Sequence, residues 1–280
     1  MLLIPIHTPL LKSKDDLASI LMNAAQIEPG DIIVISSKAV ATVEGGAIDL
    51  SKMHPSEDAK KWSMKTGRSP AFTEATLMEM KRLHGNIIGD CPGALLTEVQ
   101  PEGLPAGTIL TANAGLDESN VEKDRAMGWP REPLESARRL REELMKEMRT
   151  QRTQKTHRTQ KILSSASSSS SLSSSSSIAI IISDSCCHPR RLGVTAFALV
   201  AVGMDPIINL IGREDLFGKK MRITTEAVAD QLATAANMLM GNEAQSLPAV
   251  IVRDHGLPLS DFEGWVPGIE TNDDLFQKIL

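Results

Sequence analysis

Hydrophobic positions along this chain recur with the two spacings that distinguish helices from strands. Apolar residues three and four positions apart predict amphipathic helices on these segments: 13–24, 56–66, 70–83, 134–148 and 224–241. Uninterrupted apolar runs bounded by turn residues predict buried strands on these segments: 32–35, 178–182 and 249–253. The region 87–115 is rich in Gly, Pro and β-branched residues and predicts short strands and turns. Because helices and strands alternate, the pattern predicts a domain of mixed structure.

Polar residues mark the ends of several predicted elements. Ser13 is the predicted N-cap of the first helix, and Thr224 or Thr225 is the predicted N-cap of the last. Gly241 is predicted to end that last helix, since glycine tolerates the left-handed backbone of a helix C-terminus. These signals place the helix boundaries within a few residues.

Two predicted strands run directly into polar side chains. Ser37 and Lys38 follow the strand 32–35, and Asp184 follows the strand 178–182. Open sheets often place ligand-binding loops at the carboxyl ends of their strands. These positions are therefore candidates for a functional site.

The composition changes abruptly between residues 149 and 177. The segment 149–160 reads R-T-Q, R-T-Q, K-T-H, R-T-Q, and 164–177 is serine except at Ala166 and Leu172. Polar repeats with so little apolar content cannot offset the entropy of ordering, so a mobile insertion is predicted; a basic tail for an anionic partner is the alternative. Segments 1–148 and 178–280 together are predicted to form one catalytic domain.

The overall composition is that of a chain able to bury a full core. Hydrophobic residues make up 41% and charged residues 23% of its 280 positions, which excludes a disordered or fibrous protein. A net charge of -5 gives no general attraction to phosphate backbones, so no nucleic-acid partner is expected. The amino end lacks a signal-peptide pattern and no apolar run approaches about 20 residues, so no membrane association is expected.

The three cysteines are Cys91, Cys186 and Cys187. They form neither a disulfide framework nor a pair of zinc knuckles, which favours a reducing compartment and predicts a cytoplasmic protein. Cys186, Cys187 and His188 could suggest a metal or thiol site, but no second cluster completes a tetrahedron, and structural cysteines are favoured.

The common nucleotide and hydrolase motifs are missing from the sequence. It contains no G-x-x-x-x-G-K-[ST] phosphate loop, G-x-G-x-x-G turn, H-E-x-x-H helix or G-x-S-x-G elbow. The folds that carry those motifs therefore lose support.

Three stretches resemble a known enzyme family. The first reads A-N-A-G-L-D-E-S-N-V, at 112–121, and the second runs from 180 to 253 and includes I-G-R-E-D-L-F-G at 211–218. The third is the amino end, where T-P-L-L, D-D-L, G-D-I-I-V-I-S-S-K and E-G follow in order. Together they resemble the coenzyme F420-0:L-glutamate ligase family.

The resemblance implies roles for individual residues. Asp117, Asp184 and Ser185 would carry the catalysis and, with Asn242, would bind two divalent ions, Mg²⁺ or Mn²⁺. The implied nucleotide contacts are His7, Thr8, Pro9, Leu10, Ser37, Lys38, Thr42, Asn120, Met240, Gly241, Asn242 and Glu243. Without the resemblance, Asp117 could be a turn former and Asp184 a helix cap.

The chain departs from the family pattern at four of these or neighbouring positions. Thr42 stands where the family has a nucleotide-facing lysine, and Asn242 where a glutamate or glutamine completes the second metal site. The family's D-T-x-G-R becomes D-S-C-C-H, so Cys187 replaces a glycine and His188 an arginine.

The implied fold is an α+β domain with a mixed sheet in an intertwined homodimer. The implied reaction is that of an acid–amino-acid ligase in coenzyme F420 biosynthesis. GTP would phosphorylate the carboxylate of F420-0, and L-glutamate would attack the acyl phosphate to form an amide. Two alternatives stay open: a related ligase that extends a folate or another pterin, and a nucleotide-binding homologue with impaired catalysis.

Overall fold

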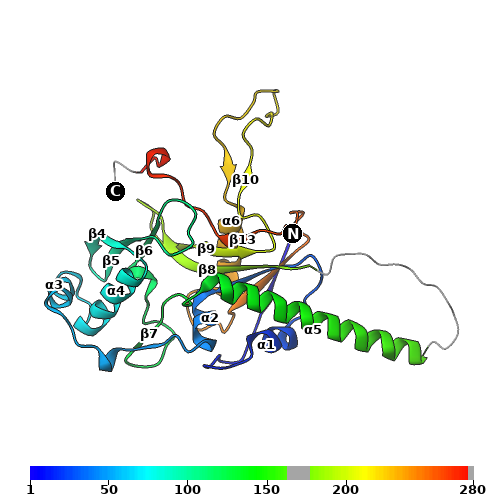
Figure 1. The fold of residues 1–280 in the computed structure, drawn as a ribbon, viewed down its shortest axis with the longest axis horizontal. Coiled ribbons are helices and arrows are strands. Elements are labelled where there is room, and N and C mark those ends of the chain that lie inside the picture. The colour runs from blue at the N-terminus through cyan, green and yellow to red at the C-terminus, as the bar shows by residue number, and fades with distance from the viewer. Residues whose placement is uncertain (163–176, 277–280) are drawn as a thin grey trace.

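A six-stranded mixed sheet forms the centre of the computed structural model, which describes residues 1–162 and 177–276 (Figure 1). Its strands lie in the order β1-β12-β2-β8-β9-β13. Their bounds are Leu2–Ile6 (β1), Ala249–Arg253 (β12), Ile32–Ser36 (β2), Ala179–Cys187 (β8), Val194–Val202 (β9) and Glu263–Trp265 (β13). Strands β2 and β8 run parallel, and the other neighbours in this sheet run antiparallel. The predicted mixed sheet is confirmed, while the predicted homodimer stays a prediction.

Helices cover both faces of this sheet. The long helix α5 (Pro133–Ile162) and α1 (Leu17–Ala24) pack over one face, against residues such as Ile33 and Ile180. Helix α6 (Val228–Met240) packs over the other face, against residues such as Val34 and Ile181. Because both faces are buried, β2 and β8 need apolar side chains at successive positions, which explains their uninterrupted apolar runs.

A smaller three-stranded sheet lies beside the central one (Figure 1). It consists of β4 (Asn86–Cys91), β5 (Ala94–Val99) and β6 (Ile109–Ala112). Helices α3 (Glu57–Thr66) and α4 (Pro70–Arg82) accompany it, capped by Ser56 and Ser69 as their side chains accept backbone N–H groups. Both helices match the predicted segments.

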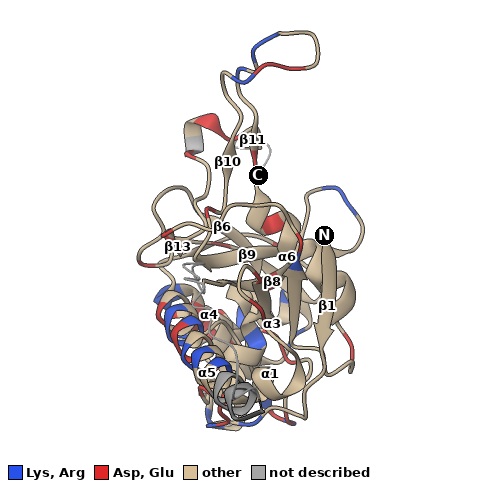
Figure 2. Ribbon diagram, turned by 90° about the vertical axis from the view of Figure 1, so that its right-hand side faces the viewer, with Lys and Arg blue, Asp and Glu red and all other residues tan. Residues whose placement is uncertain are grey.

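Short elements connect the two sheets. They are α2 (Ser37–Val43), β3 (Ile48–Asp49), β7 (Arg125–Ala126), and the single-turn helices η1 (Leu50–Lys52) and η2 (Asn113–Gly115). A third single-turn helix, η3 (Thr271–Asp273), follows β13. Strand β3 pairs with β7. A further pair, β10 (Ile208–Asn209) and β11 (Thr225–Glu226), forms the base of an arm that projects from the body (Figures 1 and 2).

Helix α5 is longer than the sequence pattern predicted. The apolar spacing ends at Met148, but the helix continues through the basic triplets to Ile162. Arg, Gln and Lys are good helix formers, and the hydroxyls of Thr150 and Thr153 donate to carbonyls one turn earlier, so the polar repeat can extend the helix. Acidic and basic residues alternate along the ribbon of α5 (Figure 2). The serine-rich part of the predicted mobile insertion, 163–176, lies outside the described residues.

The predicted caps of the first and last helices are wrong. Asp16, not Ser13, caps α1, and its carboxylate accepts the Ser19 N–H at 3.0 Å. The N-cap of α6 is Ala227, without a side-chain bond, because Thr225 is used by the β10–β11 ladder. Gly241 does follow the last residue of α6, with φ of 67°. Among the described helices, none has the length and apolar character needed to cross a bilayer.

Candidate functional site

A large cavity lies at the carboxyl ends of the parallel strands β2 and β8. Its volume is about 1470 Å³, and its walls come from both sheets and from the loops 112–128 and 240–248. Ser36 of β2 pairs with Ser183 of β8, so the residues that follow these strands emerge at the same sheet edge. This is the edge at which open sheets bind ligands.

The loop containing Asp117 is held by an unusual backbone. Asn113, Ala114 and Gly115 all have positive φ, of 51°, 53° and 78°. The Asn113 side chain accepts the Leu95 N–H at 2.9 Å and the Ala114 N–H donates to Thr97 Oγ1 at 3.0 Å, which offsets the strain of two non-glycine residues. A Cβ on Gly115 would lie 2.7 Å from the Trp129 ring. The A-N-A-G signature is therefore explained by local structure.

Asp117 forms an ion pair with Lys38 at the first turn of α2. Lys38 Nζ lies 2.6 Å from Asp117 Oδ2 and also donates to the Ser119 carbonyl at 3.0 Å. The Ser119 N–H and hydroxyl donate to the same carboxylate. Burial would raise the pKa of Asp117, but the hydrogen bonds from Lys38 and Ser119 outweigh it and lower the pKa below its ordinary value.

Asp184 lies on β8 just after a bulge. The register of β8 against β9 shifts between Ile182 and Ser183, which changes the direction of the residues that follow. Asp184 Oδ2 accepts the Trp129 indole N–H at 2.6 Å. Burial raises the pKa of Asp184, and the Trp129 hydrogen bond and the charge of Lys38 offset this only in part. Lys38 therefore acts electrostatically on both carboxylates.

The predicted nucleotide-contacting segments, far apart in sequence, come together around this cavity. The Thr8 N–H donates to the Ser246 carbonyl at 3.1 Å, and Asn120 Nδ2 donates to the Glu243 carbonyl at 3.1 Å. Of the predicted site residues, the cavity lining includes Thr8, Pro9, Leu10, Ser37, Lys38, Thr42, Asp117, Asn120, Asp184, Ser185, Met240, Gly241, Asn242 and Glu243. His7 is not in the lining. The shared cavity brings these residues together, while their individual roles stay predictions.

The departures from the family pattern also line the cavity. The Thr42 hydroxyl donates to the Lys38 carbonyl at 2.7 Å, so it serves its own helix. His188 Nε2 lies 2.9 Å from Thr195 Oγ1, which also contacts the Cys186 sulfur at 3.3 Å. Burial raises the pKa of the Cys186 thiol, which keeps it protonated.

The cavity offers some of the oxygen ligands that a divalent ion requires. Within residues 1–162 and 177–276, no three His, Cys, Asp or Glu side chains gather as a closed metal site would need. Asp117 and Asp184 nevertheless offer hard carboxylate oxygens, and Ser185 and Asn242 offer neutral ones. Mg²⁺ is commonly held by one or two carboxylates while water and phosphate oxygens complete its shell. The residues present fit an ion that arrives with a nucleotide.

Two residues that contribute to the site, Trp129 and Arg68, were not predicted from the sequence. Trp129 is 55 positions from Asp184 in sequence, and nothing local in either segment indicates their hydrogen bond. Arg68 lies between α3 and α4, where Nε donates to the Gly93 carbonyl at 2.6 Å and Nη1 pairs with Glu118 at 3.0 Å. Both side chains contact the loop that carries Asp117: the Trp129 ring packs against Gly115, and Arg68 pairs with Glu118. These contacts depend on the fold and not on local sequence.

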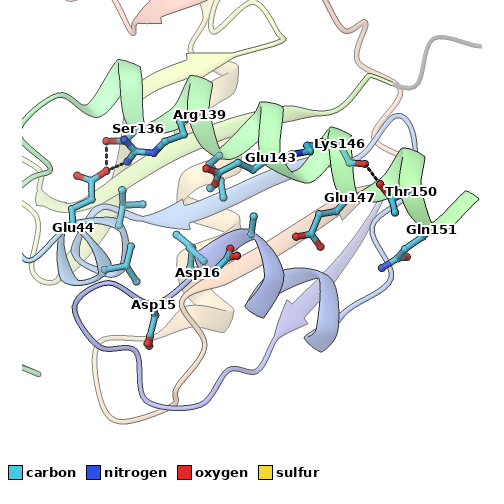
Figure 3. A pocket seen from close by; sticks show the side chains of 15 residues that line it. Asp15, Asp16, Glu44, Ser136, Arg139, Glu143, Lys146, Glu147, Thr150 and Gln151 are labelled. Carbon is cyan, nitrogen blue, oxygen red and sulfur yellow. Dashed lines mark hydrogen bonds and ion pairs between the residues drawn. The ribbon is translucent and has the colours of Figure 1, made fainter.

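A second pocket, of about 620 Å³, lies between α5 on one side and α1 and α2 on the other (Figure 3). Two of its acidic side chains bind neighbouring residues: Glu44 accepts from Ser136 at 2.7 Å and from Arg139, and Glu147 accepts from Ser19 at 2.8 Å. It contains none of the predicted site residues. The cavity at β2 and β8 is therefore the candidate active site.

Known proteins are similar to this chain over most of its length. The chain matches the F420-0:gamma-glutamyl ligase family over residues 5–153 and 169–254, so the match omits part of the low-complexity region. A protein of Methanopyrus kandleri named coenzyme F420:L-glutamate ligase is 32% identical over 89% of this chain and 85% of its own length. Proteins of the same name from Archaeoglobus fulgidus and Methanocaldococcus jannaschii are 31% and 30% identical, over 88% and 93% of this chain and 84% and 90% of their own lengths.

The mixed fold, the cavity and these similarities define an enzyme of the amide-forming ligase class. The family match covers most of the chain. The chain belongs to the F420-0:gamma-glutamyl ligase family.

Proposed function

We propose that this chain uses GTP to join L-glutamate to the carboxylate of F420-0. One observation carries the proposal: Asp117 and Asp184, from two segments that resemble the family, line the same cavity with Lys38 acting on both. The names of the relatives supply the acceptor and the amino acid.

The reaction proceeds in two balanced steps. An oxygen of the acceptor carboxylate attacks the γ-phosphorus of GTP, the bond to the β-phosphate oxygen breaks, and GDP leaves. The amine of glutamate then attacks the acyl carbon, a C–N bond forms, phosphate leaves, and the excess proton passes to solvent. Phosphoryl transfer of this kind depends on positioning and on electrostatic stabilisation more than on a protein nucleophile.

The chain's own residues do the positioning. Asp117, Asp184, Ser185 and Asn242 would hold Mg²⁺ or Mn²⁺, which when bound neutralises phosphate charge and orients the reacting oxygens. Lys38 contributes a positive charge that the triphosphate shares with Asp117. Ser37 and the loop at Gly241 complete the nucleotide contacts.

Mass spectrometry of the acceptor tests the proposed function. Purified protein is incubated with GTP, Mg²⁺ or Mn²⁺ and L-glutamate, with F420-0 in one reaction and a folate in another. A mass gain of one or more glutamyl units on F420-0 is expected. A gain on the folate alone would show that the acceptor is a pterin and not F420-0. No gain on either, with GTP still bound, would show an impaired homologue, as the departures at Thr42, Cys187, His188 and Asn242 would then explain.

We also propose that the enzyme is a homodimer. The arm that begins at β10 and β11 exposes large apolar side chains, with Leu216 at 100% and Phe217 at 94% exposure. Contiguous exposed apolar groups favour a protein interface. Equilibrium sedimentation should give twice the 30.3 kDa mass of the chain. A monomer at micromolar concentration would contradict the proposal.

A cytoplasmic location is proposed on chemical grounds. Cys91, Cys186 and Cys187 are all free thiols, as a reducing compartment maintains them. Cell fractionation followed by immunoblotting should find the protein with cytoplasmic markers, and recovery with an extracellular fraction would refute the assignment.

A further inference from the structure

One wall of the candidate active-site cavity contains none of the residues that the proposed function assigns to the nucleotide or the metal. It is formed by the three-stranded sheet, where Ala94 and Leu96 of β5 and Leu110 and Ala112 of β6 line the cavity. None of these residues belongs to the predicted nucleotide or metal contacts. We call these residues the apolar wall.

The strand register places the residues of the apolar wall on one face of the small sheet. Leu96 pairs with Ala112, and on its other side Gly89 of β4 pairs with Leu96. Side chains alternate along β5, so Leu95, Thr97 and Val99 are buried on the opposite face while Ala94 and Leu96 stay half-buried toward the cavity. Small residues thus flank a single leucine across adjacent strands.

The cavity has room for more than the nucleotide. Its volume of about 1470 Å³ exceeds the roughly 300–1,000 Å³ typical of a site for one drug-sized ligand. The proposed nucleotide contacts come from other segments, such as Thr8, Asn120 and the Gly241 loop. The apolar wall is therefore available to a second ligand.

Arg68 connects the apolar wall to the reacting end of the cavity. Its Nε donates to the carbonyl of Gly93, the residue before Ala94, and its Nη1 pairs with Glu118, the residue after Asp117. Arg68 lines the same cavity as the wall residues and Asp117, so its guanidinium is available to an anionic group of a ligand held there. An acceptor with an apolar planar ring at one end and a carboxylate at the other could place its ring on the apolar wall and its carboxylate near Asp117.

We propose that the apolar wall binds the planar heteroaromatic ring of the acceptor, with Arg68 contacting its anionic arm. This inference rests on the proposed function, since it assigns a place to the acceptor of that reaction. The deazaflavin ring of F420-0 lies flat on Leu96 and Ala112, where apolar contact supplies affinity without a demand for hydrogen bonds. The carboxylate then reaches the cavity end that contains Asp117 and Asp184.

A titration that follows the fluorescence of F420-0 tests the assignment without requiring turnover. The variant Ala112→Leu adds bulk to an exposed position of the wall, so its fold should be retained. The Kd for F420-0 should rise by roughly 10- to 200-fold, the range for small size changes in apolar pockets, while the Kd for a non-hydrolysable GTP analogue stays unchanged. Leu96→Ala, which removes contact area, should weaken F420-0 binding in the same direction.

Ala227→Leu is the matched control, because Ala227 is exposed and lies outside the cavity lining. It should bind F420-0 as the unmodified protein does. Unchanged F420-0 affinity in both wall variants would overturn the assignment while leaving the proposed function intact. Failure of the unmodified protein to bind or ligate F420-0 would instead overturn the proposed function, and the assignment with it.

Discussion

Replacing Asp184 with asparagine should abolish glutamate ligation while leaving the fold intact. Asparagine has nearly the same shape and can still accept the Trp129 indole N–H, so the change removes charge and little else. Loss of a preorganised electrostatic group in an active site costs about 10²- to 10³-fold in turnover, and a carboxylate that holds a metal should cost at least as much. Turnover is measured by mass spectrometry of F420-0.

The stability of the same variant provides a second readout. Burial raises the pKa of Asp184 in the folded state, so folding favours its neutral form. Stability from this group is present below the unfolded pKa of about 3.9 and is lost as pH rises through the raised folded pKa. Because this contribution is lost as pH rises, Asp184→Asn should keep or raise the Tm at pH 7 in the absence of ligands.

Asp230→Asn is the matched control for this experiment. Burial also raises the pKa of Asp230, whose carboxylate accepts the Ala198 N–H at 2.8 Å, but it lies outside the cavity lining. Its ligation rate should be close to that of the unmodified enzyme. Near-normal ligation by Asp184→Asn would refute the catalytic assignment of that carboxylate.

Replacing Lys38 with methionine should weaken GTP binding by about 10- to 100-fold, the range for loss of one hydrogen bond from a charged group. The change removes a positive charge from the cavity and leaves Asp117 without its partner at 2.6 Å, so a negative charge faces the triphosphate. Isothermal titration calorimetry with a non-hydrolysable GTP analogue measures the effect.

The same variant should also show a changed dependence of Tm on pH in the acid range. The pKa of Asp117 is lowered in the folded state, so its pairing contributes stability above the unfolded pKa of about 3.9, which is lost as pH falls through the lowered value. The difference in Tm between Lys38→Met and the unmodified protein should therefore shrink below pH 4. Both side chains are partly exposed, so that difference is small even at pH 7.

Lys60→Met controls for the loss of a surface lysine, because Lys60 pairs with Glu57 on the exposed side of α3. Its affinity for the GTP analogue should not change. Equal affinity of Lys38→Met and Lys60→Met for the GTP analogue would show that Lys38 does not bind the nucleotide.

Local sequence patterns predicted the elements that depend mainly on interactions between neighbouring residues. The apolar runs at β2 and β12 and the helical patterns of α3 and α4 each depend on neighbouring residues, and the structure matches them closely. The first cap was misassigned because Asp16 competes with Ser13 only three positions away. The short helix α2 was missed, since seven residues carry too little periodicity to separate a helix from a loop.

The candidate site was predictable only through resemblance. The polar residues after β2 and β8 indicated an edge of the sheet, but the pairing of Asn120 with Glu243 spans 123 positions. Contacts of that length depend on the strand order, which hydrophobic spacing does not encode. Trp129 and Arg68 were missed for the same reason.

The place of β12 in the central sheet governs the order in which the protein can be completed during synthesis. This strand comes late in the chain yet lies between β1 and β2, which come first, so the central sheet cannot be completed until the ribosome has released Ala249–Arg253. Until then the nascent β1 and β2 have unpaired edges that expose backbone hydrogen-bonding groups. Such distant pairings also make folding slow. Truncation before β12 should therefore yield insoluble protein rather than a smaller active enzyme.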